Sequence, residues 1–228
     1  MIDWNKYFDN VYILSGCSNF EKREQLKNEF NRIGLKKYHW WYGYKNNLIE
    51  LQAQDKVESH TITTYSHYGL IKTCYDLGYD HVLIMEDDVR FLNNINEIET
   101  QLNIFLDNKD KCDFYLFDYW IYQNAIFKFD CIYLNRKAME YMIYCLEHFD
   151  LVIDNYLITL YLYPNNYIKM SYTFGNDYFG YKDIYIPKEI NILPIQVMLS
   201  PIRICLEEFS PARPENFEEI KNNYNLII

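Results

Sequence analysis

Three consecutive carboxylates, Glu86, Asp87 and Asp88, follow an apolar run typical of a β-strand in the sequence HVLIMEDDVRF. Side chains on a strand alternate between its faces, so we expect Glu86 and Asp88 on one side and Asp87 on the other. Two carboxylates in one small volume repel each other, and Mg²⁺ or Mn²⁺, which prefer oxygen ligands, would relieve that repulsion. The triplet predicts a divalent-cation site; a solvated or helix-capping acidic turn is the alternative.

The segments before the triplet have the pattern of an α/β fold. Residues 11–15 (VYILS) form a short apolar run, and residues 19–33 carry apolar side chains at helical spacing. Asn19 is a candidate N-cap of this helix, and Gly34 is expected to end it. Residues 38–44 (YHWWYGY) predict a second strand. Strand, turn and helix are the opening unit of an α/β protein.

The helix that leads into the triplet is predicted from Ser66 to Leu77, with Ser66 near its N-cap and Gly78 after its end. Residues 45–62 are polar and predict a loop or a short helix. Later in the chain we expect helices at 97–106, 136–148 and 151–163, strands at 112–122 and 129–135, and extended segments at 167–174 and 190–199. The predicted helix at 151–163 begins near Asp154, and Pro164 ends it.

Strands that alternate with helices predict a mostly parallel sheet flanked by helices, in a single domain, with a ligand crevice outside the carboxyl ends of the strands. The turn from Ser15 to Ser18 and the triplet would both open onto that crevice. The N-terminus of the helix after Gly16 would favour an anion. Arg23 lies two turns into this helix and either faces the anion or is a surface side chain.

Composition excludes several classes of protein. The 228 residues are 50% hydrophobic, which is enough for a sizeable core, and the net charge of −10 argues against a nucleic-acid partner. Neither a membrane-spanning window nor a signal-type start is found, so we expect a cytoplasmic protein without a transmembrane segment. Six cysteines without a C-x-x-C pair predict reduced, buried thiols. The many aromatic rings suit stacking platforms in a sugar site.

Four segments in order, VYILSGCSNFEKREQLKNEFNRIGL, SHYGLIKTCYDLGYDHVLIMEDDVRF, FDCIYLNRKAMEYMI and LVIDNYL, resemble glycosyltransferase family 25, the lipopolysaccharide and collagen β-galactosyltransferase type. The similarity extends from residue 11 to about residue 160. It implies a Rossmann-like GT-A fold across residues 1–228, with a nucleotide-sugar half at 1–95, an acceptor half at 96–210 and an irregular tail at 211–228.

The resemblance also implies roles for the residues of the crevice. Asp88 would coordinate Mn²⁺ or Mg²⁺, and Glu86 would face the water shell of the metal or the ribose of the donor. Asp87 would either orient the donor sugar or make a structural hydrogen bond. Ser15 and Arg23 would contact the nucleotide. Such a metal stabilises the charge that builds on a departing diphosphate.

Members of the family invert the anomeric carbon, which requires a carboxylate that takes the proton of the acceptor hydroxyl. Asp154, in LVIDNYL, is the candidate base. The alternative is that Asp154 only caps the helix that begins there.

Other residues match family positions with two interpretations each. His67 would hydrogen-bond the donor phosphate or hold the acidic loop, or it would simply pack half-buried beneath a strand. Ser66 would cap its helix, and a catalytic role is the less favoured alternative. Gln196, Ser200 and Arg203 resemble a late Q-x-x-x-S-x-I segment, in which Arg203 would neutralise the diphosphate or lie on the surface.

The sequence therefore predicts a metal-dependent inverting glycosyltransferase. It would move a hexose, galactose or glucose, from a UDP-sugar donor to a hydroxyl of a glycan or glycolipid acceptor. A non-catalytic sugar-binding or assembly module with the same fold is the first alternative. A metal-dependent phosphohydrolase or nucleotidyltransferase is the second, although these enzymes gather more metal-binding Asp and His residues than this sequence presents.

Overall fold

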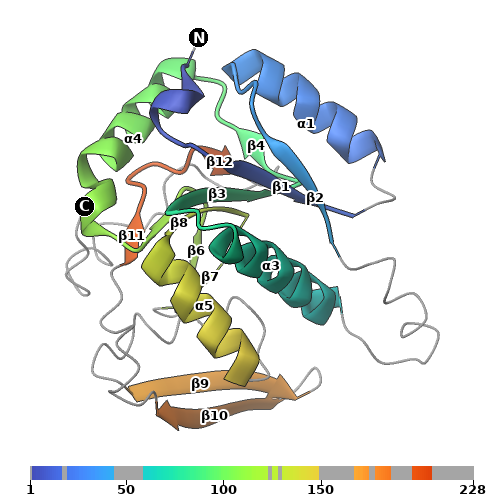
Figure 1. Ribbon diagram of the computed structural model, residues 1–228, viewed down its shortest axis with the longest axis vertical. Helices are drawn as coiled ribbons and strands as arrows, with labels where there is room; N and C mark the ends of the chain where they lie inside the picture. Colours follow the sequence, from blue (N-terminus) through green and yellow to red (C-terminus); the bar gives the residue numbers. More distant parts are fainter. Residues whose placement is uncertain are drawn as a thin grey trace.

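A computed structural model of the protein describes residues 2–16, 20–43, 59–122, 125–127, 130–148, 167–174, 178–185 and 197–206. Its centre is a six-stranded sheet with the strand order β11-β5-β8-β3-β1-β2 (Figure 1). These strands are β1 (Val11–Ser15), β2 (His39–Tyr42), β3 (His81–Glu86), β5 (Phe114–Leu116), β8 (Cys131–Asn135) and β11 (Val197–Leu199).

The sheet is mixed. Strand β1 is parallel to β2 and β3, and β11 is parallel to β5, whereas β8 is antiparallel to both of its neighbours. A parallel pairing between β5 and β8 would require a crossover, usually a helix. The described part of their connection holds only the hairpin of β6 (Trp120–Tyr122) and β7 (Ala125–Phe127). The expected α/β class is confirmed, and the mostly parallel character is interrupted at β8 for this reason.

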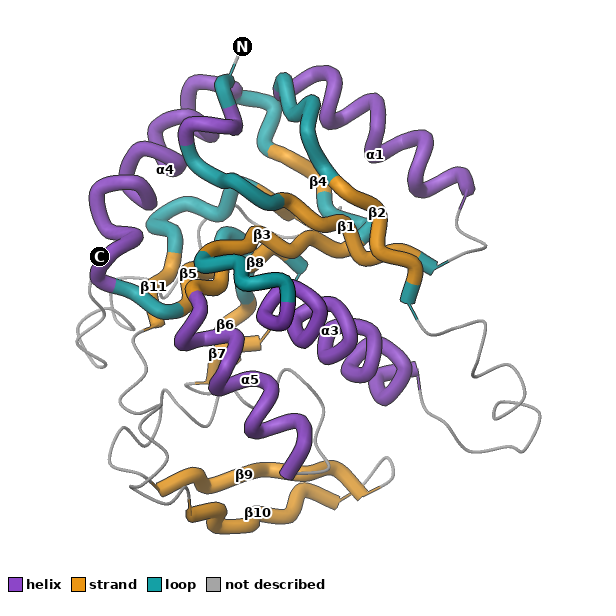
Figure 2. Tube along the Cα trace, viewed as in Figure 1, coloured by secondary structure: helices purple, strands orange, loops and turns teal. Residues whose placement is uncertain are grey.

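Helices cover both faces of the sheet (Figures 1 and 2). Helices α1 (Phe20–Ile33) and α4 (Ile95–Asn108) lie on one face, and α3 (Ser59–Asp76) and α5 (Arg136–His148) lie on the other. Along β3 the side chains alternate between these layers, and all four central ones, Val82 to Met85, are buried. A strand buried on both faces explains why HVLIM is a continuous apolar run.

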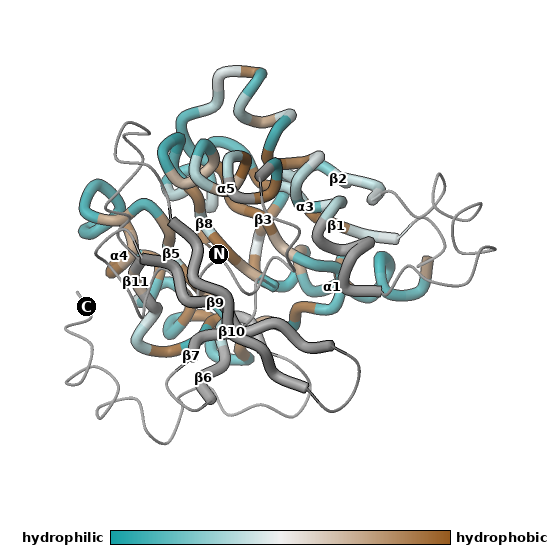
Figure 3. Tube along the Cα trace, turned by 90° about the horizontal axis from the view of Figure 1, so that it is seen from below, coloured by the Kyte–Doolittle hydropathy of each residue, from teal (hydrophilic) through white to brown (hydrophobic). Residues whose placement is uncertain are grey.

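The core on the α1 and α4 face is rich in aromatic rings. The ring centroid of Phe105 lies 5.2 Å from that of Phe8 and 4.7 Å from that of Tyr133, and those of Tyr115 and Phe117 are 4.8 Å apart. Figure 3 shows the hydrophobic stretches on the strands at the centre of the molecule. Offset and edge-on ring pairs add to the stability from area burial alone. This core fixes the strands whose ends form the site.

The ends of α1 and α3 agree with the sequence prediction, whereas α4 begins two residues before the expected residue 97. Helix α1 ends before Gly34 and α3 before Gly78, and both glycines have a positive φ (82° and 79°), where a Cβ would be strained. Helix α4 begins after Asn94, whose side chain accepts hydrogen bonds from the backbone N–H groups of Asn96 and Glu97. The expected N-cap Asn19 and the helix at 151–163 lie outside the described residues.

Two expected elements differ from the structure. Helix α3 begins at Ser59, so Ser66 lies inside the helix and its assignment as an N-cap is wrong. The segment HTITT (residues 60–64) is rich in β-branched residues, which have a lower helix propensity, so the sequence did not predict a helix there. The expected strand at 112–122 is split into β5 and β6 because the backbone turns at Phe117, where two successive N–H groups donate to the carbonyl oxygen of Cys131.

The remaining elements are short or peripheral. They are the 3₁₀ helices η1 (Trp4–Lys6) and η2 (Lys109–Lys111), and the strands β4 (Arg90–Phe91), β9 (Tyr167–Phe174), β10 (Tyr178–Tyr185) and β12 (Cys205–Leu206).

No helix in the described part of the chain is long and apolar enough to cross a membrane. Among the residues that the structure describes, Cys74, Cys112 and Cys131 are free and buried. Burial raises the pKa of Cys74 and Cys112 to about 12, so both thiols are protonated at neutral pH.

Candidate functional site

The carboxyl ends of β1 and β3 lie side by side at one edge of the sheet. In the register of the parallel strands, Leu14 of β1 is paired with Glu86 of β3, and Ser15 is paired with Tyr42 of β2. The turn after β1 and the acidic triplet after β3 are therefore neighbours, as expected from the sequence. Ligands of open α/β sheets bind at such an edge.

Asp87 faces the α1 side of this edge and is almost fully buried. The Ser15 hydroxyl donates a 2.6 Å hydrogen bond to its Oδ2 atom. Arg23 donates from Nη1 to the carbonyl oxygen of Gly16 at 2.7 Å and is also buried, so its interpretation as a surface side chain is wrong. Asp87 thus makes the structural hydrogen bond that was one of its two expected roles, and Arg23 fixes the backbone of the turn after β1.

Glu86 faces the opposite layer, as strand alternation predicts. The strand ends at Glu86, so the expected alternation does not extend to Asp88, which shares Lys22 with Asp87. The Nε2 atom of His67, on α3, lies 3.0 Å from the Oε1 atom of Glu86. His67 is fully buried, whereas a quarter of the Glu86 side chain is exposed. His67 therefore holds the Glu86 carboxylate from the α3 side of the sheet, which was one of its expected roles. Its side chain is more deeply buried than expected.

Within the triplet, Asp88 is the carboxylate whose side chain makes no hydrogen bond to a described residue. Its side chain is 43% exposed, yet its Oδ1 atom is buried and has no hydrogen-bond partner among the described residues. Burial raises the pKa of Asp88, and the charge of Glu86 raises it further, while Lys22 acts in the opposite direction. A carboxylate in this state would gain from a cation ligand.

Lys22, in the first turn of α1, is a site residue that sequence reasoning did not single out. Its Nζ atom lies 3.7 Å from Asp88 Oδ2 and 3.8 Å from Asp87 Oδ1, and its side chain is 48% exposed. These distances are longer than those of a hydrogen-bonded ion pair, so the ammonium is available to another anion. A signal was present, because a helix N-terminus disfavours cations unless an anion lies close by.

Exposed aromatic rings border the same edge. The Arg23 guanidinium lies 4.5 Å from the centroid of the Phe20 ring and 5.4 Å from that of Tyr42, and these two side chains are 71% and 53% exposed. Tyr65, on α3, is also exposed. The neighbouring residue Ser66 lies so close to the end of β2 that a Cβ at Gly43 would collide with the Ser66 hydroxyl. The rings of Phe20 and Tyr42, here called the aromatic rim, could stack against a planar or sugar ring.

The donor set fits a divalent cation that is shared with a ligand. No group of three or more His, Cys, Asp or Glu side chains that could hold a metal is found among the described residues. Mg²⁺, however, is usually bound by one or two carboxylates together with substrate phosphates and water. Asp88, whose Oδ1 atom has no hydrogen-bond partner in the described chain, and its neighbour Glu86 can supply those carboxylates.

Other expected site residues lie elsewhere. Asp154 and Gln196 fall outside the described residues. The Ser200 hydroxyl is buried and donates to the carbonyl oxygen of Ile202 at 2.6 Å. Arg203 is 1% exposed and pairs with Asp118, so its surface role is wrong and it is not open to a diphosphate.

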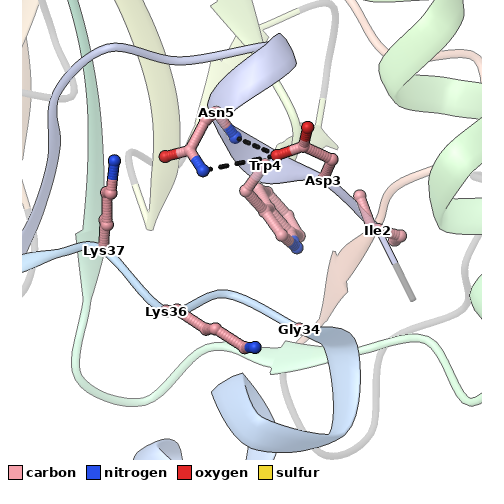
Figure 4. Close-up of a pocket in the computed structure, with 7 residues that line it drawn as sticks. All are labelled: Ile2, Asp3, Trp4, Asn5, Gly34, Lys36 and Lys37. Carbon is pink, nitrogen blue, oxygen red and sulfur yellow. Dashed lines mark hydrogen bonds between the residues drawn. The ribbon is translucent and has the colours of Figure 1, made fainter.

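A separate pocket of about 300 Å³ lies at the opposite edge of the sheet (Figure 4). It is lined by Ile2, Asp3, Trp4, Asn5, Gly34, Lys36 and Lys37. The residues from Gly34 to Lys37 precede β2, so the pocket is at the amino end of that strand, whereas the acidic triplet is at the carboxyl ends. Trp4 donates from its indole nitrogen to the carbonyl oxygen of Ile33. This pocket is therefore built around the end of α1 and is distinct from the candidate site.

Comparison with known proteins gives few matches. No protein-family model matches the sequence, and no curated protein matches it. Among solved structures, the chain is similar to one described as the crystal structure of a glycosyltransferase involved in the glycosylation of the major capsid of PBCV-1, with a TM-score of 0.39 and 15% sequence identity. The match covers 60% of this chain and 65% of that chain, which is less than two thirds of its length.

Proposed function

We propose that this protein is a metal-dependent inverting glycosyltransferase of the family 25 type. In this proposal it moves galactose or glucose from a UDP-sugar donor to a hydroxyl of a glycan or glycolipid. The observation that supports it best is the meeting of Ser15, Arg23, Asp87 and Asp88 at the carboxyl ends of β1 and β3, where Lys22 adds an exposed cation. This combination suits a diphosphate that is bound together with a divalent cation.

In this proposal each residue of the site has a role that follows from its surroundings. Asp88, with Glu86 beside it, would hold Mn²⁺ or Mg²⁺, which as a Lewis acid stabilises the negative charge on a departing diphosphate. Lys22 and the N-terminus of α1 would attract the same phosphates. His67 would keep Glu86 in place. The exposed rings of Phe20 and Tyr42 would offer a face for the base or sugar of the donor.

The acceptor side of the reaction is assigned to Asp154. Its carboxylate would take the proton of the acceptor hydroxyl while the hydroxyl oxygen attacks the anomeric carbon in line with the departing diphosphate. The Asp154→Asn variant should bind the donor as the wild type does and transfer it at least about 100-fold more slowly, the lower end of the range for general-base catalysis. A wild-type transfer rate would remove Asp154 from this role.

One observation favours a non-catalytic sugar-binding module. Lys22 already places a positive charge within 4 Å of both Asp87 and Asp88, which partly replaces the counter-charge of a metal. In such a module the aromatic rim would contact a glycan directly, and no nucleotide would be required.

A calorimetric titration with UDP, GDP and CMP sugars, each with and without Mn²⁺, tests the two functions. Binding of one UDP-sugar that disappears with EDTA, followed by release of UDP with an acceptor present, would support the transferase. Glycan binding without any nucleotide-sugar binding would support the module. The Asp76→Asn variant is a matched control, because Asp76 is an exposed carboxylate of α3 that pairs only with Lys72 among the described contacts and should leave binding unchanged.

A further inference from the structure

The acidic turn continues directly into β4, whose two residues are held by a strand from the end of the described chain. Strand β12 pairs antiparallel with β4, with Cys205 opposite Phe91 and Leu206 opposite Arg90. The backbone N–H of Leu92 also donates to the carbonyl oxygen of Ile204 at 3.0 Å. The position of the chain just after Asp88 therefore depends on residues 204–206.

That strand is in turn tied to the end of β5. The backbone N–H of Ile204 donates to the carbonyl oxygen of Phe117, and that of Ser200 donates to the carbonyl oxygen of Leu116. The Tyr119 hydroxyl donates to the carbonyl oxygen of Ser200 at 2.8 Å. Residues 200–206, here called the strap, thus connect the end of β5 with β4.

A buried ion pair lies at the centre of the strap. The Nη1 atom of Arg203 is 3.4 Å from Asp118 Oδ1 and donates to the carbonyl oxygen of Tyr119 at 2.9 Å. Arg203 and Asp118 are each 1% exposed. Replacing a buried ion pair by apolar side chains of similar volume often leaves stability unchanged, whereas in some proteins such pairs fix a single arrangement of the chain. The pair is therefore better suited to setting the place of the strap than to adding net stability.

We infer that Asp118 and Arg203 are positioning residues that hold the acidic turn in place through the strap and β4. None of their described contacts is with a residue of the acidic triplet. Among the described contacts of β4, Arg32 donates to the carbonyl oxygens of Phe91 and Leu92, and Arg90 donates to the side chain of Gln25. These bonds fix β4 against α1, and the strap holds its other side. The consequence for sugar transfer depends on the proposed function, whereas the consequence for the acidic turn does not.

The decisive variant is the double substitution Asp118→Leu with Arg203→Met, which keeps the volume of the pair and removes both charges. Hydrogen–deuterium exchange should become at least tenfold faster in peptides covering 88–92 and 200–206, with peptides of β1 and α1 unchanged. Under the proposed function, the affinity for a Mn²⁺–UDP-sugar complex should fall by a similar factor. The Arg203→Lys variant keeps a positive charge opposite Asp118 but carries it on one nitrogen in place of the guanidinium fork, so it should retain part of the protection.

Two results would overturn the inference. One is wild-type exchange at 88–92 in a folded double variant, and the other is an equal rise in exchange in all peptides, which would make the pair a contributor to global stability alone. The Lys72→Met variant, in an exposed ion pair of α3, serves as the control and should change neither region. If the wild type binds no nucleotide sugar, the proposed function fails, while the exchange result still decides whether the pair positions the turn.

Discussion

Two groups of carboxylates lie at the same edge of the sheet in opposite surroundings. Asp118 is sealed from solvent and faces the arginine of the strap, which also bonds to the neighbouring backbone. Asp88 is 43% exposed and is met only by a lysine at 3.7 Å among the described ion pairs. A carboxylate sealed against a buried arginine supports the structure, whereas an exposed one beside a half-exposed lysine is accessible to a ligand.

The largest expected effect is on stability, at the sealed pair. The single variant Arg203→Met leaves the buried carboxylate of Asp118 without its arginine, and breaking a buried pair in this way costs about 3–5 kcal/mol. Urea unfolding followed by circular dichroism should show this loss as a lower midpoint. A loss below about 1 kcal/mol would show that the pair is already solvated, and the contrast with Asp88 would disappear.

The second largest effect is on function, at the open carboxylate. Under the proposed function, Asp88→Asn should lower Mn²⁺-dependent binding or turnover of a UDP-sugar by at least about 100-fold, which corresponds to about 2.7 kcal/mol at 1.36 kcal/mol for each tenfold. The same variant should be slightly more stable, because it removes a partly buried charge next to Glu86. Since the side chain is 43% exposed, solvent screening limits the gain to less than about 1 kcal/mol, or a rise of roughly 2 °C in Tm.

This pair of results sharpens the contrast, because function and stability should change in opposite directions at Asp88. Binding and a thermal melt measured on the same preparation would check both. An unchanged donor affinity in Asp88→Asn would remove Asp88 from the metal site.

An intermediate effect is expected at Asp87, which belongs to the same triplet and yet resembles Asp118 in its burial. Ser15→Ala would leave the buried Asp87 carboxylate without its 2.6 Å donor, and the loss should be about 1.5–3 kcal/mol in unfolding free energy. Ser15→Thr keeps a hydroxyl and should restore part of the stability. If Ser15→Ala is as stable as the wild type, the hydrogen bond has been replaced by water and Asp87 belongs with the open group.

A smaller effect is expected at Lys22. Lys22→Met should change stability by less than about 0.5 kcal/mol, because the ion pairs are long and the side chain is 48% exposed. Donor affinity should fall by several-fold, and more strongly at low salt, if the ammonium meets a diphosphate. Lys27→Met, on the same helix, tests charge alone, because Lys27 pairs with Glu24 away from the triplet. Equal losses in both variants would indicate a general electrostatic effect.

The smallest effect is a pH dependence of stability. The pKa of Asp88 is raised above its ordinary value of 3.8, so the folded state binds this proton more tightly than the unfolded state does. Stability should therefore fall as pH rises from about 4 through the raised pKa, and metal affinity should rise over the same range. The difference in Tm between Asp88→Asn and wild type should be close to zero below pH 4 and largest at neutral pH. A constant difference would contradict the raised pKa.

Much of this arrangement could be predicted from the sequence where the signals are local. The strand before the triplet, the helix ended by Gly34 and the shared edge of β1 and β3 all follow from periodicity and from the rules for open sheets. The start of α3 could not, because its first turns are rich in threonine. Lys22 was hidden because its role depends on how α1 lies against the triplet.

The pairing of Asp118 with Arg203 could not be predicted either. The two residues are 85 positions apart, and nothing in their immediate sequence context points to a buried pair. An arginine is usually exposed, which favoured a surface role that the structure contradicts. Long-range contacts of this kind are set by tertiary packing, whereas periodicity and capping signals depend only on the local sequence.

The strap also bears on the order in which the protein folds. Strands β1 and β3 lie near each other in the chain and can pair as soon as α3 forms, whereas β4 receives its partner only from Cys205 and Leu206. Contacts between residues so distant in sequence close a long loop and form slowly. During synthesis the acidic turn would therefore emerge early and acquire its final shape among the last events, so a nascent chain could hold a nearly complete sheet before it holds a working site.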